Sequence, residues 1–450
     1  MSEAGIFAGE RHAVVGLGRS GAPVADALAA MGARVFIWDD RLEARLISPY
    51  PPLQTPFDLR GFTSLVLSPG IAHALPKRHP AAAAALAAGV PIVSDAELLY
   101  RATRRRRSKA RFAGVTGTNG KSTTTALLRH ILVSVGRESA AGGNLGIASL
   151  ALPALGDDGV YVLEMSSYML ERLTSLRFDV ASVLNLSPDH LDRHGDMSGY
   201  AAAKRHVFDR QTDADTAVLG IDDAATAAMA AGLAGRVVRI SAAQPADLWC
   251  QDGVLRDAAG PILTMADAPA LPGAHNAQNA AAAAAMALAL GVAREALAEA
   301  IGSFEGLAHR QQRVALIDGI PWVNDSKATN ADAAARALAC YQRIIWIAGG
   351  QAKAGGIEAL APFFPRVAHA LLIGRDAPSL SSTLRNAGVK FTMSGAIEAA
   401  VASARSMAKR LEADVVLLSP ACASFDQFSS FEARGDRFAE LARAAQEATR

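Results

Sequence analysis

Cysteine is scarce in this sequence. Only Cys250, Cys340 and Cys422 occur among 450 residues, far apart and without the Cys-x-x-Cys spacing of a zinc site. Three dispersed cysteines cannot build a disulfide framework, which excludes the small disulfide-stapled secreted folds. We interpret these thiols as small buried side chains in a reducing compartment.

Long apolar runs and a recognisable leader are also lacking. No uncharged apolar stretch approaches the roughly 18 residues that cross a bilayer, and the alanine-rich stretch 278–291 is too short and too weakly hydrophobic. Residues 1–18 lack a basic region followed by an apolar core and a cleavage site. We therefore expect a cytoplasmic protein without a membrane partner.

An excess of charge of one sign is absent as well. The 45 Lys and Arg residues nearly balance 43 Asp and Glu residues, for a formal net charge of +2. This balance argues against general affinity for nucleic acids. The basic run 104–107 has no interleaved aromatic residues, so we interpret it as a solvated linker. We expect no nucleic-acid partner and a monomer.

The residues that are present are those of a globular α/β protein. Hydrophobic residues make up 51% of the chain, and 450 residues correspond to about three domains at roughly 150 residues each. Short β-rich runs alternate with helix-like stretches such as 21–31 and the alanine tract 81–85, which predicts parallel sheets covered by helices. The β-rich runs are 12–16, 34–38, 64–67, 112–116, 343–348, 369–373 and 414–418. Breaks in this pattern predict three α/β domains at 1–108, 109–308 and 309–450.

The strongest local signal is GVTGTNGKS at residues 114–122. It resembles the phosphate loop G-x-x-x-x-G-K-[ST], and we take Gly114, Gly120, Lys121 and Ser122 as its fixed residues. A strand at 111–115 enters the loop, and a helix-like segment at 123–133 leaves it. We expect Lys121 to reach the β and γ phosphates and Ser122 to place its hydroxyl on magnesium. A nucleotide-dependent switch and a ligase both need such a loop.

A second glycine loop, GLGRSG at residues 16–21, follows the first strand and opens the first helix. Asp39 and Asp40 end the second strand about twenty residues later, where dinucleotide-binding folds recognise a ribose. A purely structural turn and a nicotinamide site are alternatives. We prefer a handle for a nucleotide diphosphate, because the loop at 114–122 already accounts for the energy source.

Acidic and basic residues of the middle part add candidates for metal and phosphate chemistry. Glu164 ends a predicted strand at 161–164, where it would serve as a magnesium ligand or as a salt-bridge partner. The segment DHLDRH at 189–194 does not fit the spacing of a tetrahedral zinc site, so we favour a second magnesium site there. Asn276 and Asn279 lie one helical turn apart, as phosphate or purine ligands or as helix caps. Lys204, taken alone, has the character of a surface lysine.

Ten motifs in this order resemble the Mur ligases of peptidoglycan synthesis. They extend along the whole chain and comprise GLGRSG, SPG (68–70), GTNGKST, GGNLG, LEMSSY, DHLDRHG, HNAQN, His309-Arg310, NDSKATN and SPACASFDQF. The phosphate loop and the HNxxN element are features of the whole family. The last two motifs indicate its glutamate-adding branch.

The resemblance implies a Rossmann-like domain for a UDP-sugar, a central phosphate-loop ATPase domain, and a C-terminal Rossmann-like domain that admits the amino acid. It implies an ATP-dependent amide ligase that joins D-glutamate to UDP-N-acetylmuramoyl-L-alanine through an acyl phosphate. Two magnesium ions are implied, together with a carbamylated lysine at Lys204. A ligase for L-glutamate or another amino acid is the alternative within the family. A dehydrogenase and a nucleotide-dependent switch are alternatives outside it.

Motif matching also implies a role for each site residue. For ATP these are Gly117, Thr118, Asn119, Gly120, Lys121, Ser122, Thr123, Asn276, Asn279, Arg310, Asp325 and Lys327; for magnesium, Ser122, Glu164, His190 and Lys204. For the UDP-sugar they are Arg19, Ser20, Asp39, Arg41, Gly70, Asn144 and Ser166; for D-glutamate, Thr329, Lys353, Ser424 and Phe431. Lys121, His190, Lys204 and Arg310 are the implied catalytic residues. Met169 stands where the family commonly has glutamine, so an amide contact with substrate is not expected there.

Overall fold

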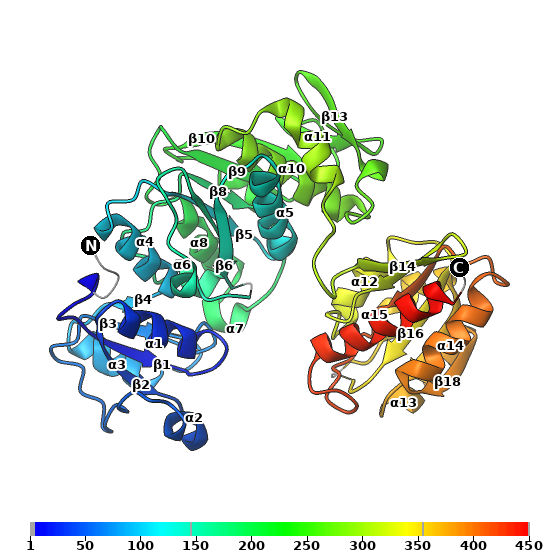
Figure 1. Ribbon diagram of the computed structural model, residues 1–450, viewed down its shortest axis with the longest axis horizontal. Helices are drawn as coiled ribbons and strands as arrows, with labels where there is room; N and C mark the ends of the chain where they lie inside the picture. The colour runs from blue at the N-terminus through cyan, green and yellow to red at the C-terminus, as the bar shows by residue number, and fades with distance from the viewer. Residues whose placement is uncertain (1–4, 145, 353–354, 449–450) are drawn as a thin grey trace. The chain divides into compact units, whose positions relative to one another are not determined.

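The chain folds into α/β structure with three β-sheets in two compact units (Figure 1). The computed structural model describes residues 5–144, 146–352 and 355–448. Contacts group Met1–Ala268 with Ala274–Ser303 as the first unit, and Pro269–Gly273 with Phe304–Arg450 as the second. The predicted α/β class with largely parallel sheets is confirmed. The domain boundaries at 108 and 308 stay predictions.

The first sheet is parallel, with the strand order β2-β1-β3-β4. Its strands are β1 (Arg11–Val15), β2 (Arg34–Trp38), β3 (Ser64–Leu67) and β4 (Ile92–Val93); its helices are α1 (Gly21–Ala30), α2 (Leu42–Leu46), α3 (Pro80–Ala87) and α4 (Asp95–Arg105). The predicted strands 34–38 and 64–67 are confirmed, and the first strand begins one residue before its prediction. All four residues of β3 are buried, as expected for a strand covered on both faces.

The second sheet has nine strands in the order β13-β12-β11-β10-β9-β8-β5-β7-β6. They are β5 (Arg111–Thr116), β6 (Ser139–Gly143), β7 (Val160–Glu164), β8 (Val180–Val183), β9 (Thr216–Gly220), β10 (Arg236–Ser241), β11 (Leu248–Gln251), β12 (Val254–Asp257) and β13 (Gly260–Thr264). The sheet is parallel from β6 to β11, but β11, β12 and β13 pair antiparallel. The prediction of a parallel sheet is therefore wrong at this edge, because Asp252 and Gly253 form a tight hairpin with positive φ angles.

Helices α5 and α10 pack beside each other and against this sheet (Figure 1). The helices of this part are α5 (Lys121–Ser134), α6 (Ser167–Leu170), α7 (Leu191–His194), α8 (Met197–Arg205), α9 (Ala224–Ala228), α10 (Ala274–Ala289) and α11 (Leu297–Gly302). Short 3-10 turns are η2 (Ser149–Ala151), η3 (His206–Phe208), η4 (Met265–Asp267) and η5 (Arg294–Ala296). The alanines 280–285 of α10 are all buried. Their small side chains let α10 lie close to both partners.

The first two sheets share one continuous hydrophobic core. It contains Leu28 of α1, Val93 of β4, Leu98 of α4 and Phe112 of β5, all buried. The basic run 104–107 ends α4: Arg104 donates to the carbonyl oxygens of Ser108 and Ala110. The linker after α4 is thus tied to the strand that follows. None of the helices in the described residues is long and apolar enough to cross a membrane.

The third sheet, in the second unit, has the order β14-β15-β19-β16-β17-β18. Its strands are β14 (Gln312–Ile317), β15 (Ile320–Asn324), β16 (Ile344–Gly349), β17 (Val367–Ile373), β18 (Phe391–Gly395) and β19 (Val415–Leu418); its helices are α12 (Ala331–Leu338), α13 (Ala377–Asn386), α14 (Ile397–Ala408), α15 (Phe431–Glu447) and the 3-10 helix η6 (Glu358–Arg366). Trp346 and Ala348 of β16 pack on one face, and Ile345 and Ile347 pack on the other. Helices cover both faces, as in doubly wound folds.

A buried carboxylate connects α4 to the second sheet. Glu97 is fully buried and accepts hydrogen bonds from the backbone amides of Thr174, Ser175 and Leu176 at 2.9–3.0 Å, and from Arg101 at 2.9 Å. Burial alone would raise its pKa, but hydrogen bonds from the Ser175 hydroxyl and from these three backbone amides outweigh burial and hold the pKa of Glu97 at about 2. The ionised form is therefore the one that the fold requires.

We expect Glu97→Gln to lower the free energy of unfolding by about 2–3 kcal/mol, because an amide cannot accept from so many donors. Chemical denaturation at pH 7 measures the change, with the exposed Glu43→Gln as the control. The pKa of Glu97 is lowered by folding, so its contribution is complete above the ordinary glutamate pKa and is lost as pH falls toward 2. The difference between wild type and variant must therefore shrink in acid. A constant difference would contradict this account.

Candidate active site

The phosphate loop connects the carboxyl end of β5 to the amino end of α5. Gly117 and Gly120 have φ angles of +146° and +84°, a region that favours glycine. A Cβ atom on Gly120 would lie 2.1 Å from Oδ1 of Asn279, so a side chain there would force Asn279 to move. Gly114 was wrongly taken as the first glycine of the loop. It lies within β5, where a Cβ atom would meet the Phe178 ring at 2.9 Å.

Hydrogen bonds from neighbouring segments hold the loop in shape. The amides of Thr118 and Asn119 donate to the carbonyl oxygen and side-chain Oδ1 of Asn185, at 2.8 and 2.9 Å. Lys121 Nζ donates to the carbonyl oxygens of Gly117 and Thr118, at 2.9 and 2.8 Å. The ammonium group therefore lies across the loop, where an anionic phosphate would be attracted to it. Ser122 is buried in the first turn of α5, followed by Thr123.

The structure brings both asparagines of the HNAQN segment to this loop. Asn276 and Asn279 are buried in α10, and Nδ2 of Asn279 donates to Oδ1 of Asn276 at 3.0 Å. Thr124 Oγ1 donates to Oδ1 of Asn279 at 3.3 Å. Asn279 lies inside the helix, so the helix-cap alternative is wrong for this residue.

A pocket of about 380 Å³ opens beside the loop at Asn119. Its polar lining includes Asn185, Gln278 and Asp222, which form a chain: Asn185 Nδ2 donates to Gln278 Oε1 at 3.1 Å, and Gln278 Nε2 donates to Asp222 Oδ2 at 2.9 Å. Sequence reasoning missed these three residues, because each is an isolated polar residue in a different segment. Only the fold places them at one nucleotide-sized pocket.

Glu164 ends β7, the neighbour of β5, and its carboxylate is almost fully buried. Asn144 Nδ2 donates to Oε1 at 2.8 Å, whereas Oε2 is buried without a hydrogen-bond partner among the described residues. A buried carboxylate oxygen without a partner is costly. A divalent cation would satisfy it, so this donor set fits magnesium, which prefers oxygen ligands. The salt-bridge alternative for Glu164 finds no support in the described part of the chain.

Lys204 is a buried residue of α8 and not the surface lysine that its sequence context indicated. Only 2% of it is exposed, and its Nζ donates to the carbonyl oxygen of Gly117 at 2.9 Å. The Tyr200 ring lies 4.5 Å from the same nitrogen. Burial, followed by repulsion from Lys121, lowers the pKa of Lys204 to about 6. A large part of this amine is therefore neutral, and so nucleophilic, near neutral pH.

The two histidines of the DHLDRH segment differ sharply. The His190 side chain is 47% exposed and lies beside Asp189 at 3.4 Å and the Tyr168 ring. The His194 side chain is buried between Glu171, at 3.1 Å, and Ser167 Oγ, at 2.9 Å. Among the described residues, no three His, Cys, Asp or Glu side chains gather as a metal cluster. Only His190 is available for a ligand in solution.

The N-terminal glycine loop borders a pocket of about 340 Å³ that is lined by Gly16, Gly18, Arg19, Ser20 and Asp39, among others. The backbone folds tightly here, since a Cβ atom on Gly21 would lie 1.7 Å from the carbonyl oxygen of Gly16. Ser68 Oγ donates to the same carbonyl oxygen at 2.8 Å, which joins the SPG loop, with Gly70, to this pocket.

The Asp39 carboxylate holds the glycine loop and Arg41 together at this pocket. It accepts from the Leu17 amide at 2.7 Å and from Nε of Arg41 at 3.1 Å. Burial opposes ionisation, but the bonds from Arg41 and Leu17 outweigh it and hold the pKa of Asp39 at about 2. Of the residues implied for a UDP-sugar, Arg19, Ser20 and Asp39 line the pocket.

Asn144 and Ser166 lie elsewhere in the first unit, at the ends of β6 and β7. Ser166 Oγ caps α6 through the Met169 amide, at 3.3 Å. The Met169 side chain is buried in the core.

Arg172 is a further residue that sequence reasoning missed. Its guanidinium is buried and donates to the carbonyl oxygens of Leu67 and Ile71, at 2.9 and 2.6 Å, and to Nδ1 of His73 at 3.2 Å. It thus fixes the segment around the SPG loop from a position just after α6. No local motif signals this role, because its partners lie about a hundred residues away.

In the second unit, the residues implied for ATP gather after β15. Asp325 is buried, and its carboxylate accepts hydrogen bonds from Ser419 Oγ at 2.8 Å and from the Gln311 amide at 3.2 Å. Burial raises the pKa of Asp325 to about 7, although Arg310 opposes the shift. The Lys327 amide donates to the carbonyl oxygen of His309 at 3.0 Å, and Nζ of Lys327 lies 5.7 Å from the Phe431 ring. Arg310, Asp325, Lys327 and Phe431 are thus neighbours in the fold.

The other residues implied for D-glutamate are distributed around the same end of the sheet. Thr329 lies two residues after Lys327, and its backbone amide donates to the carbonyl oxygen of Lys327 at 2.8 Å. Ser424 is buried after β19, and its Oγ has no hydrogen-bond partner in the described part of the chain. Lys353 lies outside the described residues. The carboxyl edge of this sheet, where ligands bind in such folds, therefore carries Asp325 and Ser424.

Known proteins show what kind of molecule carries these motifs. Residues 115–287 match the Mur ligase middle domain, and residues 309–422 match the Mur ligase glutamate ligase domain. A UDP-N-acetylmuramoylalanine–D-glutamate ligase of Paramagnetospirillum magneticum is 48% identical, covering 98% of this chain and 97% of its own. The chain belongs to the Mur ligase family. Similar Mur ligases with the same printed name occur in Rhodospirillum rubrum (47% identity, 97% and 94% coverage) and Caulobacter vibrioides (45%, 96% and 95%).

Solved structures of Mur ligases share this fold. The UDP-N-acetylmuramate–alanine ligase of Thermotoga maritima superposes with a TM-score of 0.60 at 19% identity, covering 97% of this chain and 99% of its own. A UDP-N-acetylmuramoyl-L-alanyl-D-glutamate–2,6-diaminopimelate ligase also gives 0.60, at 20% identity and coverage of 89% and 96%. At this identity the likeness concerns the Mur ligase fold alone.

The close approach of Gly120 to Asn279 can be tested on stability. We expect Gly120→Ala to lower the free energy of unfolding by about 3 kcal/mol, from left-handed strain and overlap with Asn279. Gly136→Ala is the matched control: its φ is +76°, nothing lies within 4 Å of its Cβ position, and strain alone should cost about 1 kcal/mol. In an Asn279→Ala background the cost of Gly120→Ala should fall toward that of the control. Equal costs in both backgrounds would rule out the overlap.

Proposed function

We propose that this protein is the ATP-dependent ligase that adds D-glutamate to UDP-N-acetylmuramoyl-L-alanine in peptidoglycan precursor synthesis. The observation that carries the proposal is 48% identity over 98% of the chain to a relative that bears this name. The phosphate loop, with Glu164 and Lys204 buried around it, supplies the chemical basis. We further propose a cytoplasmic monomer with domains at 1–108, 109–308 and 309–450.

The reaction has two steps. The muramoyl-alanine carboxylate attacks the γ phosphorus of ATP, ADP leaves, and an acyl phosphate forms. The neutral amine of D-glutamate then attacks the acyl carbon, inorganic phosphate leaves, and the amine loses a proton. Two anions meet in the first step, so cationic groups must neutralise the reacting oxygens. We assign this role to Lys121, whose ammonium group lies across the loop, and to Arg310.

For the nucleotide, the loop residues Gly117 to Thr123 would hold the phosphates by backbone amides and by Lys121. Asn276 and Asn279 would support the loop from α10, in keeping with the contact of Asn279 with Thr124. We assign Arg310, Asp325 and Lys327 to ATP as well. Within the second unit, the hydroxyl of Ser419 donates to the Asp325 carboxylate and orients it.

Magnesium would be held by Ser122, Glu164 and His190, with the second ion at a carbamate on Lys204. Bound magnesium neutralises phosphate charge and orients the γ phosphate for in-line attack. The buried Oε2 of Glu164, which lacks a hydrogen-bond partner among the described residues, supports the assignment of the first ion. For the second, burial of Lys204 beside Gly117 places a partly neutral amine in the site, and reaction with carbon dioxide would turn it into an anionic oxygen ligand. Exposed His190, paired with Asp189, is also a candidate base for the second step.

For the substrates, Arg19, Ser20, Asp39, Arg41 and Gly70 would hold the UDP moiety at the N-terminal pocket. We assign Asn144 and Ser166 to the sugar end of the same substrate. Thr329, Lys353, Ser424 and Phe431 would bind D-glutamate. The buried hydroxyl of Ser424, without a partner among the described residues, is free to donate to a carboxylate. A ligase for L-glutamate or another amino acid is the second candidate. The two candidates differ only in the residues that bind the amino-acid substrate.

We expect phosphate release from purified protein and ATP only when UDP-N-acetylmuramoyl-L-alanine and D-glutamate are both present. A panel of D- and L-amino acids identifies the preferred substrate. Lys121→Ala should reduce the rate by at least about a hundredfold, because the loop loses its phosphate cation. Preference for another amino acid would replace the proposed substrate, and phosphate release without any amino acid would favour a simple ATPase. Near-normal turnover in Lys121→Ala would refute the ATP assignment.

The carbamate on Lys204 has its own test. We expect Lys204→Ala to lose activity and to recover part of it when a short carboxylic acid is added, because the acid would restore an oxygen ligand. Lys109→Ala, an exposed lysine, is the control and should neither lose activity nor respond to the acid. Loss without rescue at any acid concentration would count against the modification. Mass spectrometry under gentle conditions should detect added carbon dioxide on wild type only.

A further inference from the structure

A basic pocket lies at the amino edge of the third sheet, the edge opposite to Asp325 and Ser424. The segments that lead into β16, β17, β18 and β19 meet there, because parallel strands begin at the same edge. The pocket has a volume of about 890 Å³, within the range of small-molecule sites. Its charged lining consists of Arg343, Arg366, His369, Lys390, Arg410 and Asp414.

The single lining carboxylate does not neutralise these cations. Asp414 accepts from the backbone amides of Gln342 and Arg343, at 3.1 and 2.9 Å. Arg343 is 3.9 Å from Glu412, and both side chains are largely exposed, so this ion pair is weak. Arg366 donates to the carbonyl oxygen of Ala339 at 2.7 Å. In the described part of the second unit, positive charge therefore exceeds negative charge at the pocket wall.

Lys390 and Arg410 both lie close enough to His369 to oppose a positive charge on its ring. Burial lowers the pKa of His369, and the charges of Lys390 and Arg410 lower it further. No ion pair of Lys390 or Arg410 with a carboxylate occurs among the described residues. Like charges held in a concave site raise the local concentration of anions. The wall is thus arranged to favour an anionic ligand.

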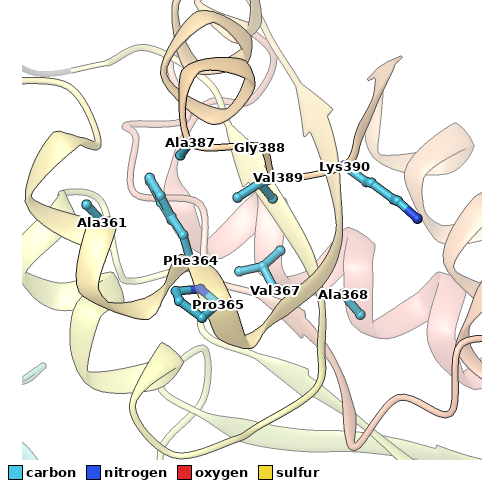
Figure 2. Close-up of a pocket in the computed structure, with 9 residues that line it drawn as sticks. All are labelled: Ala361, Phe364, Pro365, Val367, Ala368, Ala387, Gly388, Val389 and Lys390. Atoms are coloured by element: carbon cyan, nitrogen blue, oxygen red, sulfur yellow. The ribbon is translucent and has the colours of Figure 1, made fainter.

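A second pocket of about 430 Å³, in which most of the lining side chains are apolar, adjoins the basic one (Figure 2). The two share Pro365, Ala368 and Lys390. Figure 2 shows Phe364 and Val389 facing the apolar space, whereas the Lys390 side chain extends away from them. A ligand that fills both parts would need a negative group at one end and an apolar group at the other.

We propose that this double pocket binds a small organic phosphate, with its phosphate on Lys390 and Arg410 and its apolar group beside Phe364. Arginine and lysine are the side chains that best match phosphate oxygens. A concave site suits a small molecule better than a flat lipid surface. The site lies at the edge of the sheet away from Asp325 and Ser424, so it does not depend on the proposed ligase function.

The test uses 1-naphthyl phosphate as the probe, titrated calorimetrically into the full chain with excess ADP and magnesium to fill the nucleotide site. We expect binding in the millimolar range or tighter, and stronger binding than for inorganic phosphate or 1-naphthol. Lys390→Ala/Arg410→Ala should weaken binding by about tenfold or more. Lys409→Ala/Arg443→Ala removes the same charge from exposed residues outside the pocket and should change binding by less than about twofold.

Phe364→Leu separates the two halves of the pocket. It should weaken 1-naphthyl phosphate and leave inorganic phosphate unchanged, and a thermal melt checks that the variant is folded. Equal loss in the two double variants would reduce the effect to overall charge and overturn the proposal. Absence of probe binding to wild type would do the same. Binding to phosphatidylglycerol vesicles without binding to the free probe would assign the surface to a lipid and also overturn it.

Discussion

The side-chain nitrogens of two lysines converge on one carbonyl oxygen, that of Gly117. Lys121 reaches it from the first turn of α5 and Lys204 from the buried side of α8, each at 2.9 Å. Burial in this site, followed by repulsion from the nearby Lys121, lowers the pKa of Lys204. Glu164 at the end of β7 and Asn279 of α10 surround the same loop. Other contacts in the first unit hold the segments around these groups in place.

Support comes from charged groups that are fully enclosed by their partners. Glu97 holds the segment before β8, and Arg172 holds the segment around Ser68. Arg434 of α15 does the same in the second unit, where its buried guanidinium donates to the carbonyl oxygens of Ser326 and Cys422. In each case a single charged side chain forms hydrogen bonds with several backbone groups of a loop, as a helix or strand partner would. Such loops can be irregular without leaving buried polar groups unpaired.

Local patterns predicted much of the fold and part of the site. The strands 34–38 and 64–67 were predicted with the bounds observed, because short apolar runs between glycine-rich turns leave little ambiguity. The hairpins β11–β12 and β14–β15 were missed, although Asp252-Gly253 and Asp318-Gly319 carry the turn signal. Asn185, Gln278 and Arg172 could not be predicted, since their partners are distant in sequence. The error at Gly114 arose from aligning a strand glycine with a loop position.

The sequence by itself determined the phosphate-loop motif and the family, because both depend on residue type at fixed local spacing; the roles of Lys121, Ser122 and Glu164 stay predictions. Tertiary structure decided which of the remaining polar residues are buried together. It buries the side chains of His194 and Lys204, and it gathers basic residues of four separate segments at one edge of the third sheet. Burial and electrostatic repulsion depend on distances across the fold, and no spacing along the chain encodes them.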